Sequence, residues 1–195
     1  MATPALKPGA KMFDLRTVPP LKEYQFAVDR FTKGITDWRP ALHLCGDVFK
    51  GQMRSQFNTQ GRETGPEWAA LSPEYKAWKT AHYPGNGIGV LTGALRMAMT
   101  GGGGYSEFVT HTTGSFGMSG SSKAAPYGGY FSFGTSRMPA RPVIRPTAAQ
   151  GREYQKAVHG WLVSEAHHAG LTGALSGVAN APLPDTDYTQ ALSAL

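Results

Sequence analysis

The clearest pattern in the chain is a run of large apolar residues spaced three and four apart. It predicts one long amphipathic helix, whose apolar stripe is Trp38, Leu42, Cys45, Phe49, Met53 and Phe57. Thr36 or Asp37 is the predicted N-cap. Pro40 then falls in the first turn, where its missing N–H is tolerated. Gly61 lies just past the predicted end of this helix.

Three further stretches carry helix start or stop signals. Thr147 is the predicted N-cap and Gly170 the C-cap of a last helix, with an apolar face of Tyr154, Val158, Trp161 and Leu162. Ser72 followed by Pro73 predicts the start of a short helix, because proline suits the first helical position. Thr92 is the predicted cap of another short helix, which carries Leu95, Met97 and Met99.

Alternating apolar and polar residues predict strands in two places. Residues 23–29 place Tyr24, Phe26 and Val28 on one face and predict a short half-buried strand. Residues 105–118 alternate more weakly and predict a β-hairpin, and residues 127–133 predict a single helical turn. The fold class that follows is α+β, with a small antiparallel sheet packed against one long and several short helices.

Glycine and proline divide the chain into three parts. The sequence has 195 residues, of which 25 are Gly and 14 are Pro, so long loops around a modest core are expected. We interpret residues 1–20 as an extended N-terminal arm, 21–170 as a single α+β domain and 171–195 as a C-terminal tail. Residues 101–104, four consecutive glycines, predict a flexible glycine-rich loop.

Residues 134–146 form the most unusual segment, Gly-Thr-Ser-Arg-Met-Pro-Ala-Arg-Pro-Val-Ile-Arg-Pro. Each proline fixes its own φ, removes a backbone donor and pushes the preceding residue out of the helical region. The segment therefore predicts a stiff, extended strut that is neither a helix nor a central strand. It presents Arg137, Arg141 and Arg145 at intervals of four, which suits positioning against a neighbour better than catalysis.

Composition narrows the class of protein. The net charge of +6 favours acidic surfaces or nucleic acid as partners, but the charges are scattered and no basic run is present. Cys45 is the single cysteine, which excludes an intramolecular disulfide and a cysteine zinc site. No apolar run is long enough to span a membrane, and the N-terminus lacks a signal-peptide core. We expect a soluble protein made in the cytoplasm, with no membrane partner.

Candidate chemistry is sparse. On a helix, His43 and Asp47 share a face and could form a His–Asp pair, although a core cysteine flanked by solvated polar residues explains the same stretch. The glycines at 101–104 lack the Lys-Ser/Thr of a phosphate-binding loop. We therefore predict no catalytic residues, no metal site, no cofactor and no enzymatic activity.

Several segments together resemble the phage virion morphogenesis family, the tail-completion or neck proteins of Mu-like tailed phages. The resemblance covers residues 37–144: a long helix, a tryptophan loop at Trp68, an Ser-Pro helix start at 72–73, a hairpin and Tyr127. It also includes Leu-Thr-Gly-Ala-Leu-Arg at 91–96 and Pro-Ala-Arg-Pro at 139–142, and it rests on the order and spacing of these elements together rather than on any one of them. The N-terminal arm, the Gly/Ser-rich insert before Tyr127 and the C-terminal tail depart from the family pattern.

The resemblance implies a structural virion protein that forms a ring at the head–tail interface or tail end. Its partners would be copies of itself in a six-fold or twelve-fold ring, other phage connector and tail proteins, and DNA passing through the lumen. The structural motif would be Thr92, Gly93, Leu95, Arg96, Pro139, Arg141 and Pro142. The candidate subunit interface would be Trp68, Tyr127, Arg137, Arg141 and Arg145.

Two alternatives come from other classes. The net charge and the aromatic residues fit a basic nucleic-acid-binding module, whose binding would weaken steeply with salt. A hydrolase that uses His43 and Asp47 is the third hypothesis.

Overall fold

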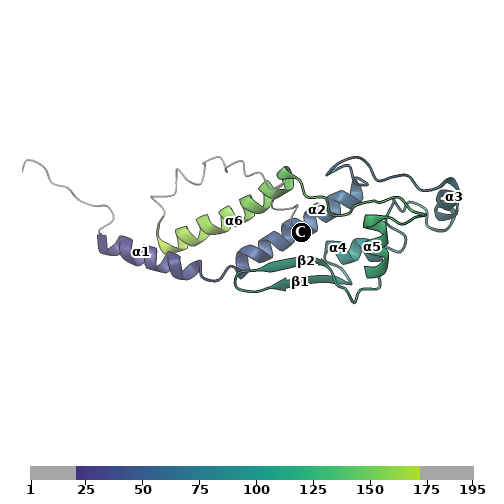
Figure 1. Cartoon of the computed structure of the whole chain (residues 1–195). Coiled ribbons are helices and arrows are strands. Elements are labelled where there is room, and N and C mark those ends of the chain that lie inside the picture. The colour runs from purple at the N-terminus through teal and green to yellow at the C-terminus, as the bar shows by residue number, and fades with distance from the viewer. Residues whose placement is uncertain (1–20, 172–195) are drawn as a thin grey trace, which may run out of the picture.

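The computed structural model describes residues 21–171. The predicted arm at 1–20 lies outside these residues, as does the predicted tail at 171–195 apart from Leu171. Within them are six helices and one two-stranded antiparallel sheet, which confirms the α+β fold class. Figure 1 shows an elongated arrangement with α1 at one end, α3 at the other, and the sheet and α5 along one side.

Helices α2 (Arg39–Asn58) and α6 (Ala148–Ala169) pack against each other along the middle of the molecule (Figure 1). The predicted caps of α6 are confirmed: the Thr147 side chain accepts a hydrogen bond from the Gln150 amide, and Gly170 adopts the left-handed conformation with φ 90°. In α2 the N-cap position is held by Trp38, without a side-chain cap bond, so the prediction of Thr36 or Asp37 is wrong.

Residues 21–34 form helix α1 (Leu21–Gly34), so the predicted strand at 23–29 is wrong. The same stretch also fits a helix, because Tyr24, Val28 and Phe31 are spaced four and three residues apart. Packing decides between the two patterns: α1 lies against α6, and Ala27 is only 4% exposed. The Arg30 guanidinium donates to the carbonyl of Ala169 (2.8 Å) and ties α1 to the end of α6.

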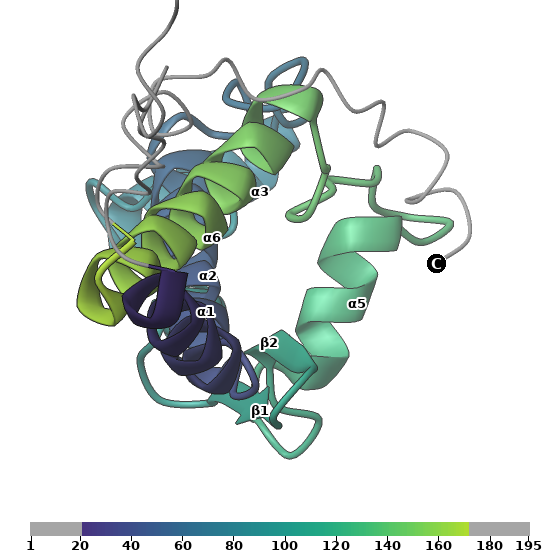
Figure 2. The same cartoon turned by 90° about the vertical axis from the view of Figure 1, so that its left-hand side faces the viewer.

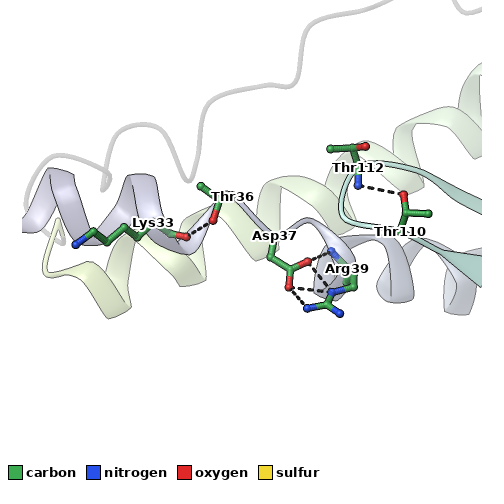
Figure 3. A network of polar contacts seen from close by, with 6 residues as sticks. All are labelled: Lys33, Thr36, Asp37, Arg39, Thr110 and Thr112. Atoms are coloured by element: carbon green, nitrogen blue, oxygen red, sulfur yellow. Dashed lines mark hydrogen bonds and ion pairs between the residues drawn. The ribbon is translucent and has the colours of Figure 1, made fainter.

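The elbow between α1 and α2 is fixed by short-range polar contacts (Figure 3). The Thr36 hydroxyl donates to the Lys33 carbonyl (2.6 Å) at the end of α1. The Asp37 carboxylate accepts from both the side chain and the backbone amide of Arg39, and these bonds lower the pKa of Asp37 to about 2. The Trp38 amide donates to the carbonyl of His111 in the hairpin turn (3.0 Å), so the elbow also holds the hairpin.

The predicted β-hairpin is confirmed as β1 (Tyr105–Val109) and β2 (Gly114–Met118). Tyr105 pairs with Met118 and Glu107 with Phe116. Both strands pack on α2 and on α4 (Ala94–Thr100), and the Phe116 ring lies 6.4 Å from the Phe49 ring.

The short helices start largely as predicted. In α3 (Pro73–His82) the Ser72 side chain accepts from the Tyr75 amide, which confirms the predicted cap. The N-cap of α4 is Gly93, and the Thr92 hydroxyl accepts only a long bond from the Ala94 amide (3.4 Å), so the prediction of Thr92 at this position is wrong. Residues 127–133, predicted as one helical turn, belong to α5 (Ala125–Phe133).

One hydrophobic core joins these elements. It contains residues from α2, the tryptophan loop, α4, α5 and the proline–arginine segment: Phe49, Met53, Phe57, Trp68, Leu95, Ala98, Met99, Ala124, Phe131 and Val143. Cys45, Phe49, Met53 and Phe57 of the predicted helical stripe are buried. Aromatic rings dominate the centre, where the Trp68 ring meets Phe57 and Phe131 edge-on at 5.4 and 5.1 Å.

The two phenylalanines of α5 provide a matched test of this core. Phe131 is 1% exposed and Phe133 is 86% exposed. We expect Phe131→Ala to lower the free energy of unfolding by about 3–5 kcal/mol because it leaves a cavity among aromatic rings. Phe133→Ala, the same substitution two residues away, should change it by less than about 0.5 kcal/mol for the monomer. Urea unfolding of both variants measures the difference, and equal losses would contradict this core.

Tyr154 gives the fold a pH dependence. Its hydroxyl donates to the Gln52 side chain (3.0 Å), and burial, reinforced by nearby negative charge, raises its pKa to about 12. Because the native state holds this proton more tightly than the unfolded chain does, the stabilisation is complete below about pH 10 and is lost as the pH rises toward 12. Urea unfolding at pH 8 to 12 should show a shallower alkaline loss in Tyr154→Phe than in the wild type. Parallel curves would exclude Tyr154 as a cause.

Candidate functional site

The proline–arginine segment at 134–146 contains no helix or named strand, as predicted. It is not extended throughout, however, because an isolated bridge between Thr135 and Met138 closes a tight turn at its start. Gly134 begins this turn with φ 76°, and a Cβ there would lie 2.7 Å from the backbone nitrogen of Ala140. Only glycine fits such a conformation beside another stretch of backbone.

The Arg141 side chain turns inward and binds the tryptophan loop. It is 3% exposed, and its Nε and Nη2 atoms donate to the carbonyls of Ala69 (2.7 Å) and Ala70 (2.9 Å). The guanidinium also lies over the Phe131 ring, 5.8 Å from its centre. Burial lowers the pKa of Arg141 from its ordinary value, and the Tyr127 hydroxyl opposes that shift. An arginine remains charged in this setting, so the Ala69 and Ala70 carbonyls replace the water that would otherwise hydrate the guanidinium.

Pro142 makes the second connection between the same two segments. Its carbonyl accepts from the Trp68 indole Nε1 (3.0 Å) and from the Gln56 amide on α2 (3.4 Å). The Arg141 amide donates to the Phe131 carbonyl (2.9 Å) and joins the segment to α5. We call this set of contacts, made by Arg141, Pro142, Trp68, Gln56 and the 69–70 carbonyls, the strut clamp.

The structure divides the candidate interface residues into two groups. Trp68 (5% exposed) and Arg141 are buried inside the chain, so neither side chain is available on the surface of this monomer. Tyr127 is 42% exposed on α5, Arg137 is exposed in the tight turn and Arg145 is partly exposed. The interface hypothesis therefore applies directly to Tyr127, Arg137 and Arg145, whose side chains reach the surface. Trp68 and Arg141 affect that surface only through the interior contacts that they make.

The Thr-Gly-Ala-Leu-Arg element shapes the start of α4. Gly93 has φ 82°, which turns the chain into the helix. Leu95 is 4% exposed and belongs to the core, and the Arg96 guanidinium donates to the Asn58 side chain at the end of α2 (3.0 Å). These contacts give the element a structural role beside the strut clamp.

His43 and Asp47 have different partners. His43 Nδ1 lies 2.6 Å from a carboxylate oxygen of Glu107 on β1, whereas Asp47 pairs with Lys50 (2.7 Å). Cys45 points into the core, and burial raises the pKa of its thiol, so it is a poor nucleophile. The geometry does not support the His43–Asp47 pair on which the hydrolase hypothesis rests.

Glu107 is the centre of a polar cluster that sequence reasoning missed. Besides His43, its carboxylate lies near the Lys50 ammonium (3.7 Å) and the Tyr105 hydroxyl (3.4 Å). Burial, followed by the negative charge of Glu107, raises the pKa of Tyr105 to about 12. Since His43 and Glu107 are 64 positions apart, only the hairpin's docking on α2 brings them together. The Glu107 cluster therefore holds the hairpin against α2.

Exposed aromatic residues on α3 were also missed. The rings of Tyr75 and Trp78 stack at 5.5 Å, and those of Trp78 and His82 at 4.9 Å, while Tyr75 and Trp78 remain 39% and 43% exposed. Their three- and four-residue spacing is visible in the sequence, but it does not reveal which face is covered. On the same helix the buried Lys79 ammonium donates to the Gly87 carbonyl, and burial lowers the pKa of Lys79.

An apolar groove of about 530 Å³ opens beside the strut clamp. Strand β2 forms one wall, α5 the opposite wall, and residues 142–144 close one side. Gly128, Gly129 and Ser132 contribute only small groups to the α5 wall, whereas Phe133 (86% exposed) and Ile144 (53% exposed) carry apolar side chains to the edge of the groove. Sequence reasoning did not predict this groove, because it forms between segments that only the fold brings together.

No family model, curated protein or solved structure matches the chain. Among the helices described between residues 21 and 171, none is long and apolar enough to cross a membrane. Over the same residues, no group of three or more His, Cys, Asp or Glu side chains gathers in a way that could hold a metal ion.

The strut clamp can be tested on Arg141. Replacing Arg141 with Met keeps a long apolar side chain but removes the donors to Ala69 and Ala70, so we expect a loss of about 1–3 kcal/mol in the free energy of unfolding. Amide hydrogen exchange should accelerate at Trp68 and Arg141. The control is Arg137→Met, an exposed arginine of the same segment, and equal effects of the two variants would contradict the clamp.

Proposed function

We propose that this protein is a structural virion subunit that forms a ring at the head–tail interface or tail end of a tailed phage, without enzymatic activity. One observation carries the proposal. The segments on which the resemblance rests, far apart in the sequence, converge on one unit, in which Trp68 bonds to Pro142 and shares the hydrophobic core with Leu95. An ordered series of motifs that folds into one connected unit supports common descent better than scattered matches do.

The chemistry of the described surface supports assembly. Large apolar side chains remain exposed on several elements: Leu21, Tyr24, Phe26, Tyr75, Trp78, Phe108, Tyr130, Phe133 and Ile144. Exposed aromatic residues in such numbers are typical of protein–protein interfaces. The partners we propose are copies of the chain in a six-fold or twelve-fold ring, together with connector and tail proteins. A contact between two different faces closes into a ring when its rotation closes.

The second candidate function is binding to nucleic acid, and the net charge of +6 is the observation that favours it. In the ring proposal the same charge would face DNA passing through the lumen, without base recognition. Phosphate-driven binding of this kind weakens steeply as salt is raised. A monomer that binds DNA tightly at low salt and never assembles would favour the second function over the first.

Assembly gives the direct test of the proposed function. We expect the purified full-length chain, alone or mixed with the connector proteins encoded beside it, to give rings of uniform diameter in negative-stain electron microscopy. Deleting its gene from the encoding phage should leave heads and tails unjoined or tails incomplete. Infectious virions that lack the protein would overturn the proposal.

A further inference from the structure

The first two turns of α1 are apolar on more than one side. Leu21 and Tyr24, 61% and 45% exposed, extend the face that packs on α6, while Phe26, 66% exposed, points away from that face by helical geometry. Helix α6 buries Ala27 farther along α1. A helix end that is apolar on two sides requires a groove rather than a single neighbouring helix.

The apolar groove between β2 and α5 has the form that such a helix end requires. Its lining includes core side chains such as Leu95 and Val143, and Gly129 and Ser132 place only small groups in the α5 wall. The groove therefore offers apolar contact below a helix and apolar side chains at its edge.

The apolar area available on each side is on the scale of a subunit contact. An aromatic side chain buries about 150–250 Å² in full. Leu21, Tyr24 and Phe26 on α1 are 45–66% exposed, and Phe133 and Ile144 at the edge of the groove are 86% and 53% exposed. Each side thus exposes on the order of 300 Å² of apolar side chain, about a third of the about 800 Å² that one partner buries in a stable complex.

The two surfaces lie too far apart to meet within one chain. Arg30 ties α1 to the end of α6, and Figures 1 and 2 both show α1 well separated from α5. Two different faces of one chain that fit each other produce head-to-tail contacts, and these generate closed rings when the rotation closes. We propose that residues 21–26 of one copy dock into the groove between β2 and α5 of the next copy. This inference rests on the ring proposed above and assigns its subunit contact.

Two single-cysteine substitutions test the contact without removing its apolar side chains. Gln25→Cys lies between Tyr24 and Phe26 on α1, and Ser132→Cys lies in the groove wall. The native Cys45 is buried and burial raises the pKa of its thiol, so we expect it not to react, and the wild-type protein treated in the same way is the control for this. Each full-length variant is treated with a short bis-maleimide, alone and as an equal mixture. We expect a product of two-chain mass in the mixture and in neither variant alone.

The control is a mixture of Gln25→Cys with Thr80→Cys, an exposed position on α3 that should give no product. Adding Phe26→Lys to the α1 variant should abolish the product of the original mixture while leaving the fold intact by circular dichroism. A product from Gln25→Cys alone would show that α1 pairs with α1, and an equal product with Thr80→Cys would show random collision. Either result overturns this contact.

The result also separates this contact from the proposed function. Rings in electron microscopy without cross-linking of residues 25 and 132 would overturn the contact and leave the ring standing. A chain that stays monomeric with its connector partners would overturn both.

Discussion

The strut clamp is the constraint on which the rest of the structure depends. A buried guanidinium must exchange its water for acceptors, and Arg141 finds them in the Ala69 and Ala70 carbonyls. The next residue, Pro142, supplies a carbonyl to Trp68 and Gln56. The loop, the strut, α2 and α5 are thereby held to one another, although the strut and the loop have no regular secondary structure. Arg141 is thus part of the interior rather than a surface cation.

The clamp also determines which side chains remain outside. It holds the strut against α5, in which Phe131 is buried while Tyr127, Tyr130 and Phe133 remain exposed. It also sets Val143 and Ile144 along one side of the groove. The surface that we propose for subunit contact is therefore a consequence of the interior contacts. The His43–Asp47 pair of the hydrolase hypothesis has no comparable support, because His43 pairs with Glu107 and Asp47 with Lys50.

Local signals predicted those parts of the fold that are decided locally. The stripe of α2, the Ser72 and Thr147 caps and the hairpin at 105–118 follow from spacing and capping chemistry, and the structure has them. The strand predicted at 23–29 is wrong because the apolar pattern there fits both a strand and a helix, and only packing against α6 decides for the helix. The inward turn of Arg141 could not be predicted, since its acceptors lie 71 and 72 positions away. The groove is lined by five segments (α4, β1, β2, α5 and residues 142–144) that only the fold brings together, so no local pattern reveals it.

A double-mutant cycle on Trp68 and Arg141 tests the clamp most directly. Trp68→Phe removes the donor to Pro142 and keeps an aromatic ring, and Arg141→Met removes the donors to the loop. If the contacts act as one unit, the double variant should lose less free energy of unfolding than the sum of the single losses, by about 0.5–3 kcal/mol. Losses that add to within about 0.3 kcal/mol would contradict the claim that one clamp organises this fold.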